Sequence, residues 1–250
     1  MEEKSHGKRR AINSIVTALF VILLFLFLIS LAISLPILNR WFYYIQIKTL
    51  DLESTGFTYD EIKEAFDLIM DYLTQPWNTD FWQSQLANGE TQLYIGVFKC
   101  SADGASHFDD CKTLFLLDIY VMIISGVLLA AICVLWKLKI VKVNSLKGHS
   151  AAFYTAIAAI VAPVALVAVI ASVGFDEAFN VFHTIFFPGK DNWIFNSRYD
   201  QIILVLPEEF FMNCAIFIAV GLVAFSAIII IIDCVICRNK RKKALKNQSF

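Results

Sequence analysis

Four long runs of apolar residues constrain the fold of this chain more than any other feature of its sequence. They cover residues 12–36, 113–137, 151–173 and 212–233. A helix needs about 20 residues to cross the hydrocarbon core of a bilayer, and each run is that long. Inside lipid, backbone N–H and C=O groups must pair within their own segment, so each run is expected to be helical. The sequence therefore predicts an α-helical integral membrane protein with four transmembrane helices.

The composition excludes an ordinary soluble domain. The chain is 58% hydrophobic and only 17% charged, whereas soluble domains have about 25% charged residues. A cleaved signal peptide is an alternative interpretation of the first run. That run is longer than the apolar part of a signal peptide and no A-x-A site follows it, so a membrane anchor is favoured.

The distribution of charge predicts the orientation in the membrane. Lysine and arginine gather in residues 1–11, 138–150 and 234–250, and the positive-inside rule places all three segments in the cytoplasm, both termini included. Residues 37–112, with twelve acidic against five basic side chains, and 174–211, with six against two, then lie outside the cell. The basic tail is expected to contact lipid headgroups, not nucleic acid.

The first outer segment, 37–112, is predicted to be a small α+β domain between spans 1 and 2. A helix is expected after Thr58, which forms a capping box with Glu61. Its apolar face has helical spacing and comprises Ile62, Phe66, Ile69 and Leu73. A strand over 91–98, "TQLYIGVF", is expected to follow a turn at Asn88-Gly89. The second outer segment, 174–211, is predicted to lie at the membrane surface.

Cysteines occur at both predicted faces of the membrane. Cys100 and Cys111 lie outside, where disulfides survive, so either a bridge or two separate thiols is expected. Cys234 and Cys237 lie at the cytoplasmic end, where one CxxC pair cannot complete a tetrahedral metal site.

Two histidines stand out as candidates for proton transfer. His107 lies in "SHFDDCK", just before the second span, and His183 lies in "FNVFHTIFFPGKDNWIFN", before the fourth. The predicted topology places both at one depth on the outer side, so we expect them to meet. A neutral imidazole can accept or deliver a proton near pH 7, and burial keeps it neutral. The alternative is that each is a structural histidine with satisfied hydrogen bonds.

Carboxylates accompany both histidines. His107 and Asp110 are three residues apart and share a face of a helical turn. If residues 176–187 are helical, Asp176, Asn180 and His183 lie along one stripe. His107, Asp110 and His183 could alternatively bind a metal, and Cys111 could be a nucleophile beside His107. Since no packed metal-ligand motif such as HExxH and no phosphate-binding loop occur in the sequence, no metal or other cofactor is expected.

The motif "SHFDDCK" together with "FHTIFFPGKDNWIFNSRYDQIILVLPEEFF" resembles the bacterial lipoprotein intramolecular transacylase (Lit) family of four-span membrane proteins. The resemblance covers essentially the whole chain. The usual form of the first motif is close to His-Met-x-Asp-Val-Lys, so Phe108 replaces methionine here and Cys111 replaces valine.

The resemblance implies an acyltransferase at the outer face of the bacterial cell membrane. Such an enzyme moves the sn-2 acyl chain of a diacylglyceryl lipoprotein to the α-amino group of its N-terminal cysteine, which gives a lyso-form lipoprotein. Amine and ester belong to one substrate molecule, so no covalent acyl-enzyme is needed. His183 is expected to be the general base and His107 its partner at the leaving oxygen or oxyanion, although the two roles can be exchanged. Supporting roles are expected for Asp110, which would orient His107, and for Asp176, Asp191, Asn192, Arg198 and Glu208.

Two other functions fit the same composition. One is a non-enzymatic four-span adaptor with an outer recognition domain, and the other is a metal-dependent lipid hydrolase. The expected partners are the lipoprotein substrate and membrane lipids.

Overall fold

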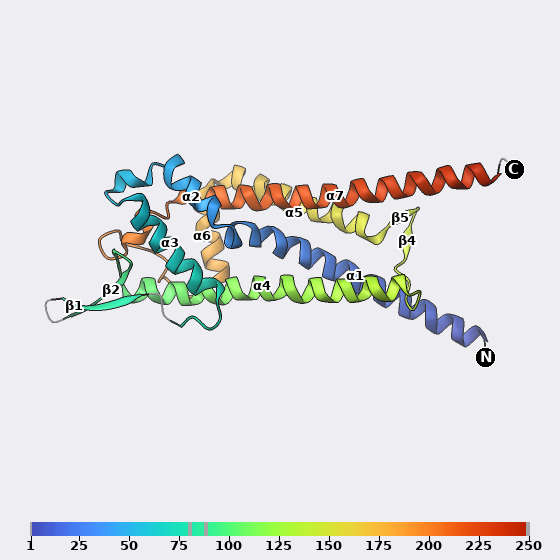
Figure 1. Ribbon diagram of the computed structural model, residues 1–250, viewed down its shortest axis with the longest axis horizontal. Coiled ribbons are helices and arrows are strands. Elements are labelled where there is room, and N and C mark those ends of the chain that lie inside the picture. The colour runs from blue at the N-terminus through green and yellow to red at the C-terminus, as the bar shows by residue number, and fades with distance from the viewer. Residues whose placement is uncertain (1, 80–81, 88–89, 249–250) are drawn as a thin grey trace. The chain divides into compact units, whose positions relative to one another are not determined.

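A computed structural model describes residues 2–79, 82–87 and 90–248 of the chain, and long helices dominate it (Figure 1). The α-helices are α1 (Glu2–Leu38), α2 (Arg40–Thr49), α3 (Tyr59–Thr74), α4 (Ala102–Lys137), α5 (Ala151–Val173), α6 (Phe175–Phe186) and α7 (Glu208–Gln248). The strands are β1 (Gln83–Ala87), β2 (Glu90–Ile95), β3 (Phe98–Cys100), β4 (Ser145–Leu146) and β5 (His149–Ser150). Two 3₁₀ turns complete the fold, η1 (Leu52–Thr55) and η2 (Gln201–Leu204).

Among the residues that the structure describes, three helices are long and apolar enough to cross a membrane. They are Gly7–Leu38 in α1, Ala102–Lys137 in α4 and Glu208–Leu245 in α7. The fourth predicted span lies in helix α5, in which the apolar stretch Ala151–Ala165 is shorter than a span. The fourth span therefore stays a prediction.

The observed helices extend past the predicted spans. Helix α4 begins at Ala102, eleven residues before the predicted start of its span, and continues for 36 residues. At 1.5 Å per residue it is about 54 Å long, well beyond a hydrocarbon core of roughly 30 Å. Helix α1 passes through Pro36, where its run was expected to end, and stops at Leu38. Helix α7 includes most of the basic tail, because lysine and arginine are good helix formers.

The chain divides into two compact units, which we name by their strands. The sheet unit comprises Ile33–Ile119 and Val167–Ile218, and it contains β1, β2 and β3. The hairpin unit comprises Met1–Ala32, Tyr120–Leu166 and Ala219–Phe250, and it contains β4 and β5.

The core of the sheet unit forms around α3, as the sequence predicts. The capping box of Thr58 and Glu61 is present in full. All four residues of the predicted apolar face are buried, namely Ile62, Phe66, Ile69 and Leu73. Tyr43 of α2 stacks on Phe66 with 3.8 Å between ring centroids, and its hydroxyl donates to the Val205 carbonyl at 2.6 Å. These contacts join α2 and α3 to the segment that precedes α7.

The predicted strand over 91–98 is two strands in the structure. Strand β2 pairs antiparallel with β1 on one side and with β3 on the other. Gly96 adopts a positive φ of 58° and, with Val97, forms the two-residue turn between the paired Ile95 and Phe98. The glycine therefore ends the strand within the predicted run. The turn expected at Asn88-Gly89 lies outside the described residues.

The hairpin unit contains a short β4–β5 hairpin that the sequence did not predict. Leu146 and His149 are paired across it. The Asp233 carboxylate of α7 accepts from the Ser150 backbone N–H at 3.0 Å and lies 2.6 Å from His149 Nδ1. The Cys237 thiol donates to the Gly148 carbonyl at 2.9 Å. Two side chains of α7 thus hold the hairpin in place.

Candidate active site

The first turn of α4 fixes the position of His107. Ser101 precedes the helix, and its hydroxyl accepts from the Gly104 N–H at 2.9 Å. The buried carboxylate of Asp200, just before η2, accepts from the Ser101 N–H at 2.8 Å. A Cβ added at Gly104 would lie 2.3 Å from Asp200 Oδ1. A glycine in this turn is therefore needed for the loop before α7 to cap the helix that bears His107.

His183 lies on α6, Phe175–Phe186, so the segment considered as a possible helix, 176–187, is helical up to residue 186. Its Nδ1 lies 2.8 Å from the Phe179 carbonyl oxygen one turn earlier. A carbonyl can only accept, so Nδ1 carries the proton and donates it. In the neutral imidazole, the lone pair is then on Nε2.

The structure brings the two predicted histidines together. Their ring centroids are 5.7 Å apart. Trp193 stacks on His183 with 4.4 Å between centroids and 25° between planes. Phe187 and Phe195 pack against His107 in T-shaped pairs, with 4.9 and 5.6 Å between ring centroids. The two imidazoles thus share one aromatic enclosure.

Burial determines the protonation of His183. Its side chain is buried among rings, with only 6% of the residue exposed. Burial lowers the pKa of His183 from its ordinary value of 6.5, while its hydrogen bond to the Phe179 carbonyl acts in the opposite direction. The neutral form, which can accept a proton, is therefore favoured at physiological pH.

His107 is also buried, at 8% exposure, but its hydrogen bonding differs. Its Nε2 lies 3.4 Å from Cys111 Sγ, one turn later on α4. Its Nδ1 is buried and has no hydrogen-bond partner among the described residues. Buried polar atoms are normally paired, so an unpaired one needs an explanation. A substrate atom is the explanation we develop below.

Asp110 has Lys190 and Asn192 as hydrogen-bond partners, and its expected role of orienting His107 stays a prediction. Its carboxylate forms an ion pair with Lys190 at 2.5 Å and accepts from Asn192 Nδ2 at 3.1 Å. The ammonium and amide donors compete successfully for both carboxylate oxygens, because a charge-assisted hydrogen bond is stronger than one to a neutral imidazole. Asp110 therefore anchors the 190–192 loop against α4.

Asn192 lies beside the histidine pair. Its Nδ2 also contacts Ser106 Oγ at 3.4 Å, next to His107 in the chain. Its Oδ1 is buried and, like His107 Nδ1, lacks a hydrogen-bond partner in the described part of the chain. The wall of the site thus presents one unused atom of the Asn192 amide and one of the His107 ring.

The remaining predicted residues are Asp176, Glu208, Asp191 and Arg198. Asp176 interacts with Glu208 at the start of α7. It is seven residues before His183 on α6, which is about 10 Å along the helix. Asp191 and Arg198 are exposed. The structure therefore gathers Asp110 and Asn192 near the histidines, and places the other four candidates around them.

The structure contradicts two alternatives from the sequence. Cys100 and Cys111 are free thiols and not a disulfide, since Cys100 is buried at the end of β3 with its thiol directed at the Ser101 carbonyl, while Cys111 contacts His107. No group of three or more His, Cys, Asp or Glu side chains in the described ranges is arranged to hold a metal ion. The set of His107, Asp110 and His183 is not among groups of that kind in the described residues.

Several residues of the site were not singled out from the sequence. Trp193 and Phe187 pack on the histidines, Lys190 pairs with Asp110, and Asp200 caps α4. Phe187, Lys190 and Trp193 lie in the motif "FFPGKDNW", which is part of the sequence that carries the family resemblance. Nothing local distinguishes Asp200, because its partner is 99 residues away in the chain.

Known proteins match this chain over most of its length. A family model described as lipoprotein intramolecular transacylase Lit matches residues 18–211. The structure of Lit from Bacillus cereus is similar at 24% identity and a TM-score of 0.72, with 96% of this chain and 98% of that chain covered. A variant of that protein with a histidine changed to arginine gives a TM-score of 0.75 at 24% identity, with 97% of this chain and 100% of that chain covered. A variant with a histidine changed to alanine gives a TM-score of 0.74 at 25% identity, with 95% and 99% covered. No curated protein matches the sequence.

Proposed function

Because the chain belongs to the lipoprotein intramolecular transacylase (Lit) family, and is thus a multi-pass membrane acyltransferase, we propose that it moves the sn-2 acyl chain of a diacylglyceryl lipoprotein to the α-amine of the same N-terminal cysteine. The product is an N-acylated, lyso-form lipoprotein. The observation that carries this proposal is the pair of buried imidazoles, 5.7 Å apart within aromatic rings.

The reaction needs two proton transfers and no external acyl donor. The amine nitrogen attacks the ester carbonyl carbon, the C–O bond to glycerol breaks, and the proton lost by the amine ends on the glycerol oxygen. Amine and ester are in one molecule, so holding them in a reactive orientation contributes about 7–11 kcal/mol. The protein is left to orient them, to move the proton and to stabilise the oxyanion.

We assign the general base to His183. Its Nδ1–H is bonded to the Phe179 carbonyl, so Nε2 carries the lone pair that takes the amine proton. Its lowered pKa keeps that lone pair available. Stacking on Trp193 fixes the plane of the ring.

We assign to His107 the hydrogen bond that stabilises the oxyanion and the leaving oxygen, while the proton that this oxygen gains is the one that His183 took from the amine. The thiol of Cys111, which is partly buried, can donate its S–H to His107 Nε2. The proton of the His107 ring is then on Nδ1, the buried atom without a partner in the described chain. The amine at His183 Nε2 and the ester at His107 Nδ1 can then each make a hydrogen bond of about 2.9 Å.

Other residues support substrate binding in this proposal. Asn192 Oδ1 accepts from an N–H of the cysteine amine or the first peptide bond. Asp110 and Lys190 hold the Asn192 loop in position. Asp191 and Arg198, both exposed, contact the lipoprotein peptide, while Asp176 and Glu208 tie α6 to α7.

We further propose the topology that the charges predict. Residues 12–36, 113–137, 151–173 and 212–233 form four spans, both termini are cytoplasmic, and the histidines lie at the outer face of the bacterial cell membrane. Support comes from the exposed apolar face of α6, where Phe182, Ile185 and Phe186 are 45%, 65% and 49% exposed. Such a face is stable in the lipid interface, which supports a position of His183 near the depth of the glycerol esters.

Mass spectrometry of lipoprotein N-termini tests the proposal. Cells that otherwise leave diacylglyceryl lipoproteins N-free should, on expressing this chain, produce lyso-form N-acyl lipoproteins. Cells expressing a folded His183→Gln variant should not. Only N-free diacylglyceryl cysteine in cells with the unaltered protein would refute the proposal.

The same material separates the two other functions. An adaptor would keep its cellular effect in the His183→Gln variant, because it performs no proton transfer. A metal-dependent hydrolase would release free fatty acid and stop when a chelator is added. The proposed transacylase instead retains the acyl chain on the lipoprotein and works in the presence of a chelator.

A further inference from the structure

A basic cavity lies in the hairpin unit, outside the candidate active site. Its volume is about 240 Å³, and Arg238, Arg241 and Lys242 of α7 line it together with His149 of β5. The cations are spaced by three and four residues, so they lie on one face of the helix. The aliphatic continuation of that face, Leu245, lines the cavity as well.

The opposite wall of the cavity is held rigidly. His149 is fixed by the Asp233 carboxylate at 2.6 Å and stacks on Phe153 with 4.2 Å between centroids. Cys237, which also lines the cavity, donates to the Gly148 carbonyl. Asp233 is the acidic group next to the cavity, and its two oxygens are used by His149 and Ser150. The cavity is thus a positive site with a preformed wall.

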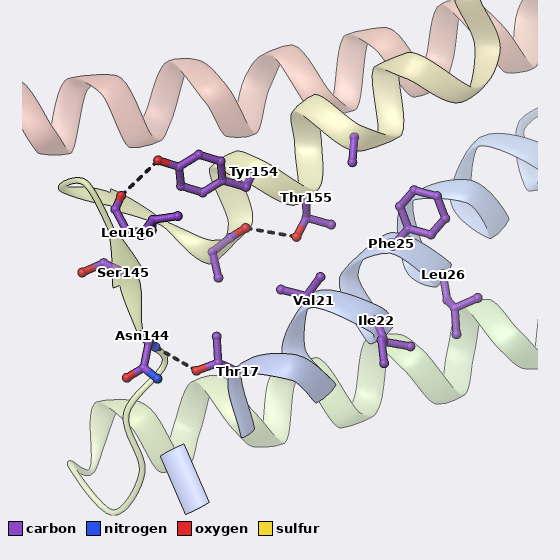
Figure 2. A pocket seen from close by; sticks show the side chains of 12 residues that line it. Thr17, Val21, Ile22, Phe25, Leu26, Asn144, Ser145, Leu146, Tyr154 and Thr155 are labelled. Atoms are coloured by element: carbon purple, nitrogen blue, oxygen red, sulfur yellow. Dashed lines mark hydrogen bonds between the residues drawn. The ribbon is translucent and has the colours of Figure 1, made fainter. Parts of the chain in front are cut away.

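An apolar cavity of about 630 Å³ adjoins the other strand of the same hairpin (Figure 2). Val21, Phe25 and Leu26 of α1 line it, and Leu146 and Tyr154 border it on the hairpin side. The Tyr154 hydroxyl donates to the Leu146 carbonyl at 3.1 Å. Leu146 is the cross-strand partner of His149, so neighbouring residues of one hairpin border the apolar and the basic cavities.

We propose that these two cavities bind one anionic phospholipid, with its phosphate on Arg241, Lys242 and Arg238 and an acyl chain in the apolar cavity. A phosphate is the ligand that two guanidinium groups and an ammonium on one helix face recognise. The adjoining apolar space selects a lipid over free phosphate. Basic pockets at the cytoplasmic ends of membrane helices are suited to such headgroups.

Native mass spectrometry of the full chain in detergent tests the site. The protein is titrated with phosphatidylglycerol, with phosphatidylcholine of the same chains, and with inorganic phosphate. We expect selective retention of phosphatidylglycerol, and about tenfold weaker binding in Arg241→Gln/Lys242→Gln, which is the loss of about one charge-assisted hydrogen bond. The matched control Lys240→Gln/Lys243→Gln removes the same charge from the same helix but from residues that do not line the cavity.

Each other result overturns the inference. If both double variants bound phosphatidylglycerol equally weakly, the effect would come from the overall positive charge of α7 and not from the cavity. Equal binding of phosphatidylcholine would remove the phosphate selectivity. Binding of inorganic phosphate that excludes phosphatidylglycerol would assign the cavity to a soluble anion.

A second variant examines the apolar half without altering charge. Ala158 is exposed and lines the apolar cavity, so Ala158→Phe fills that space without disturbing buried packing. We expect Ala158→Phe to weaken the binding of phosphatidylglycerol several-fold. Lyso-phosphatidylglycerol with one short acyl chain should bind as before, because its chain is too short to need the filled space. Unchanged binding of the two-chain lipid would contradict the acyl-chain assignment.

Discussion

The sheet unit holds two histidines packed against aromatic rings and the hairpin unit holds one, and their hydrogen-bond partners differ. His149 is paired directly with a carboxylate, that of Asp233. His107 and His183 have a thiol and a backbone carbonyl as partners instead, and the nearest acid, Asp110, is paired with Lys190 and Asn192. The contacts of Asp233 with His149 and with the Ser150 N–H hold the hairpin on α7. Two imidazoles with an unused nitrogen each can exchange protons with a substrate.

The largest expected effect comes from substituting His107 or His183, the proposed proton-transfer pair, and comparing the result with a substitution of His149. We expect His107→Gln or His183→Gln to reduce N-acylation by about 10²–10⁴-fold, the usual effect of a general acid or base. The double variant should be no slower than the worse single variant, because the two rings act on one reaction. His149→Gln should stay within about twofold of the unaltered protein. The measurement is the rate of lyso-form product from a purified diacylglyceryl lipoprotein, and equal loss in all three single variants would refute the distinction.

The pH dependence of the same rate sharpens the comparison. A histidine with a lowered pKa stays neutral to lower pH, so a base of this kind works fully until the pH falls through its lowered pKa. We expect the acidic limb due to the enzyme to have its midpoint below pH 6.5, with about a tenfold loss per pH unit beyond it. Titration of the substrate amine, whose ordinary pKa is about 8, gives a separate limb. An enzyme limb centred above pH 6.5 would remove His183 as the base.

The structural role of the hairpin histidine predicts an effect on stability. Asp233→Ala removes the acceptor for the Ser150 N–H and the partner of His149, which should lower the unfolding free energy by about 1–3 kcal/mol. Activity per folded molecule should not change. Thermal unfolding in detergent measures the first quantity, and Asp103→Ala, at an exposed acid of α4, is the control. A large loss of rate without loss of stability would contradict this assignment.

The smallest expected effect concerns the thiol beside His107. Cys111→Val keeps a side chain of similar size but removes the S–H donor, which is worth about 0.5–1.5 kcal/mol. We expect a two- to tenfold slower reaction, because His107 then populates both neutral tautomers. Cys111→Ser, with a hydroxyl donor, should recover part of the rate, and Cys133→Val should have no effect. A rate for Cys111→Val equal to that of the unaltered protein would show that the thiol does not select the tautomer.

Local patterns predicted a large part of the fold. The capping box at Thr58 and the buried face of α3 depend on residues within one helix, so periodicity and spacing suffice to find them. The apolar runs at residues 12–36 and 113–137 predict helices, because their length is also a local feature of the sequence. The approach of His107 to His183 was predictable because the two segments were expected at the same depth on one side of a small helical bundle. Residues at one depth of such a bundle lie close together.

Other features depend on partners distant in the chain, and the sequence did not reveal them. The pairing of Asp110 with Lys190 joins residues 80 apart in the chain. Gly96 divided the predicted strand, since its positive φ made a turn. The two thiols expected as a possible bridge, Cys100 and Cys111, contact different groups.

The carboxylate of Asp200 at the first turn of α4 has a consequence for how the protein tolerates mutation. The space that a side chain would take at Gly104 is filled by an oxygen of Asp200. A larger residue at position 104 would therefore clash with Asp200. Random mutagenesis with selection for folded protein should return glycine at 104 and fail to return larger residues there, unless position 200 changes at the same time.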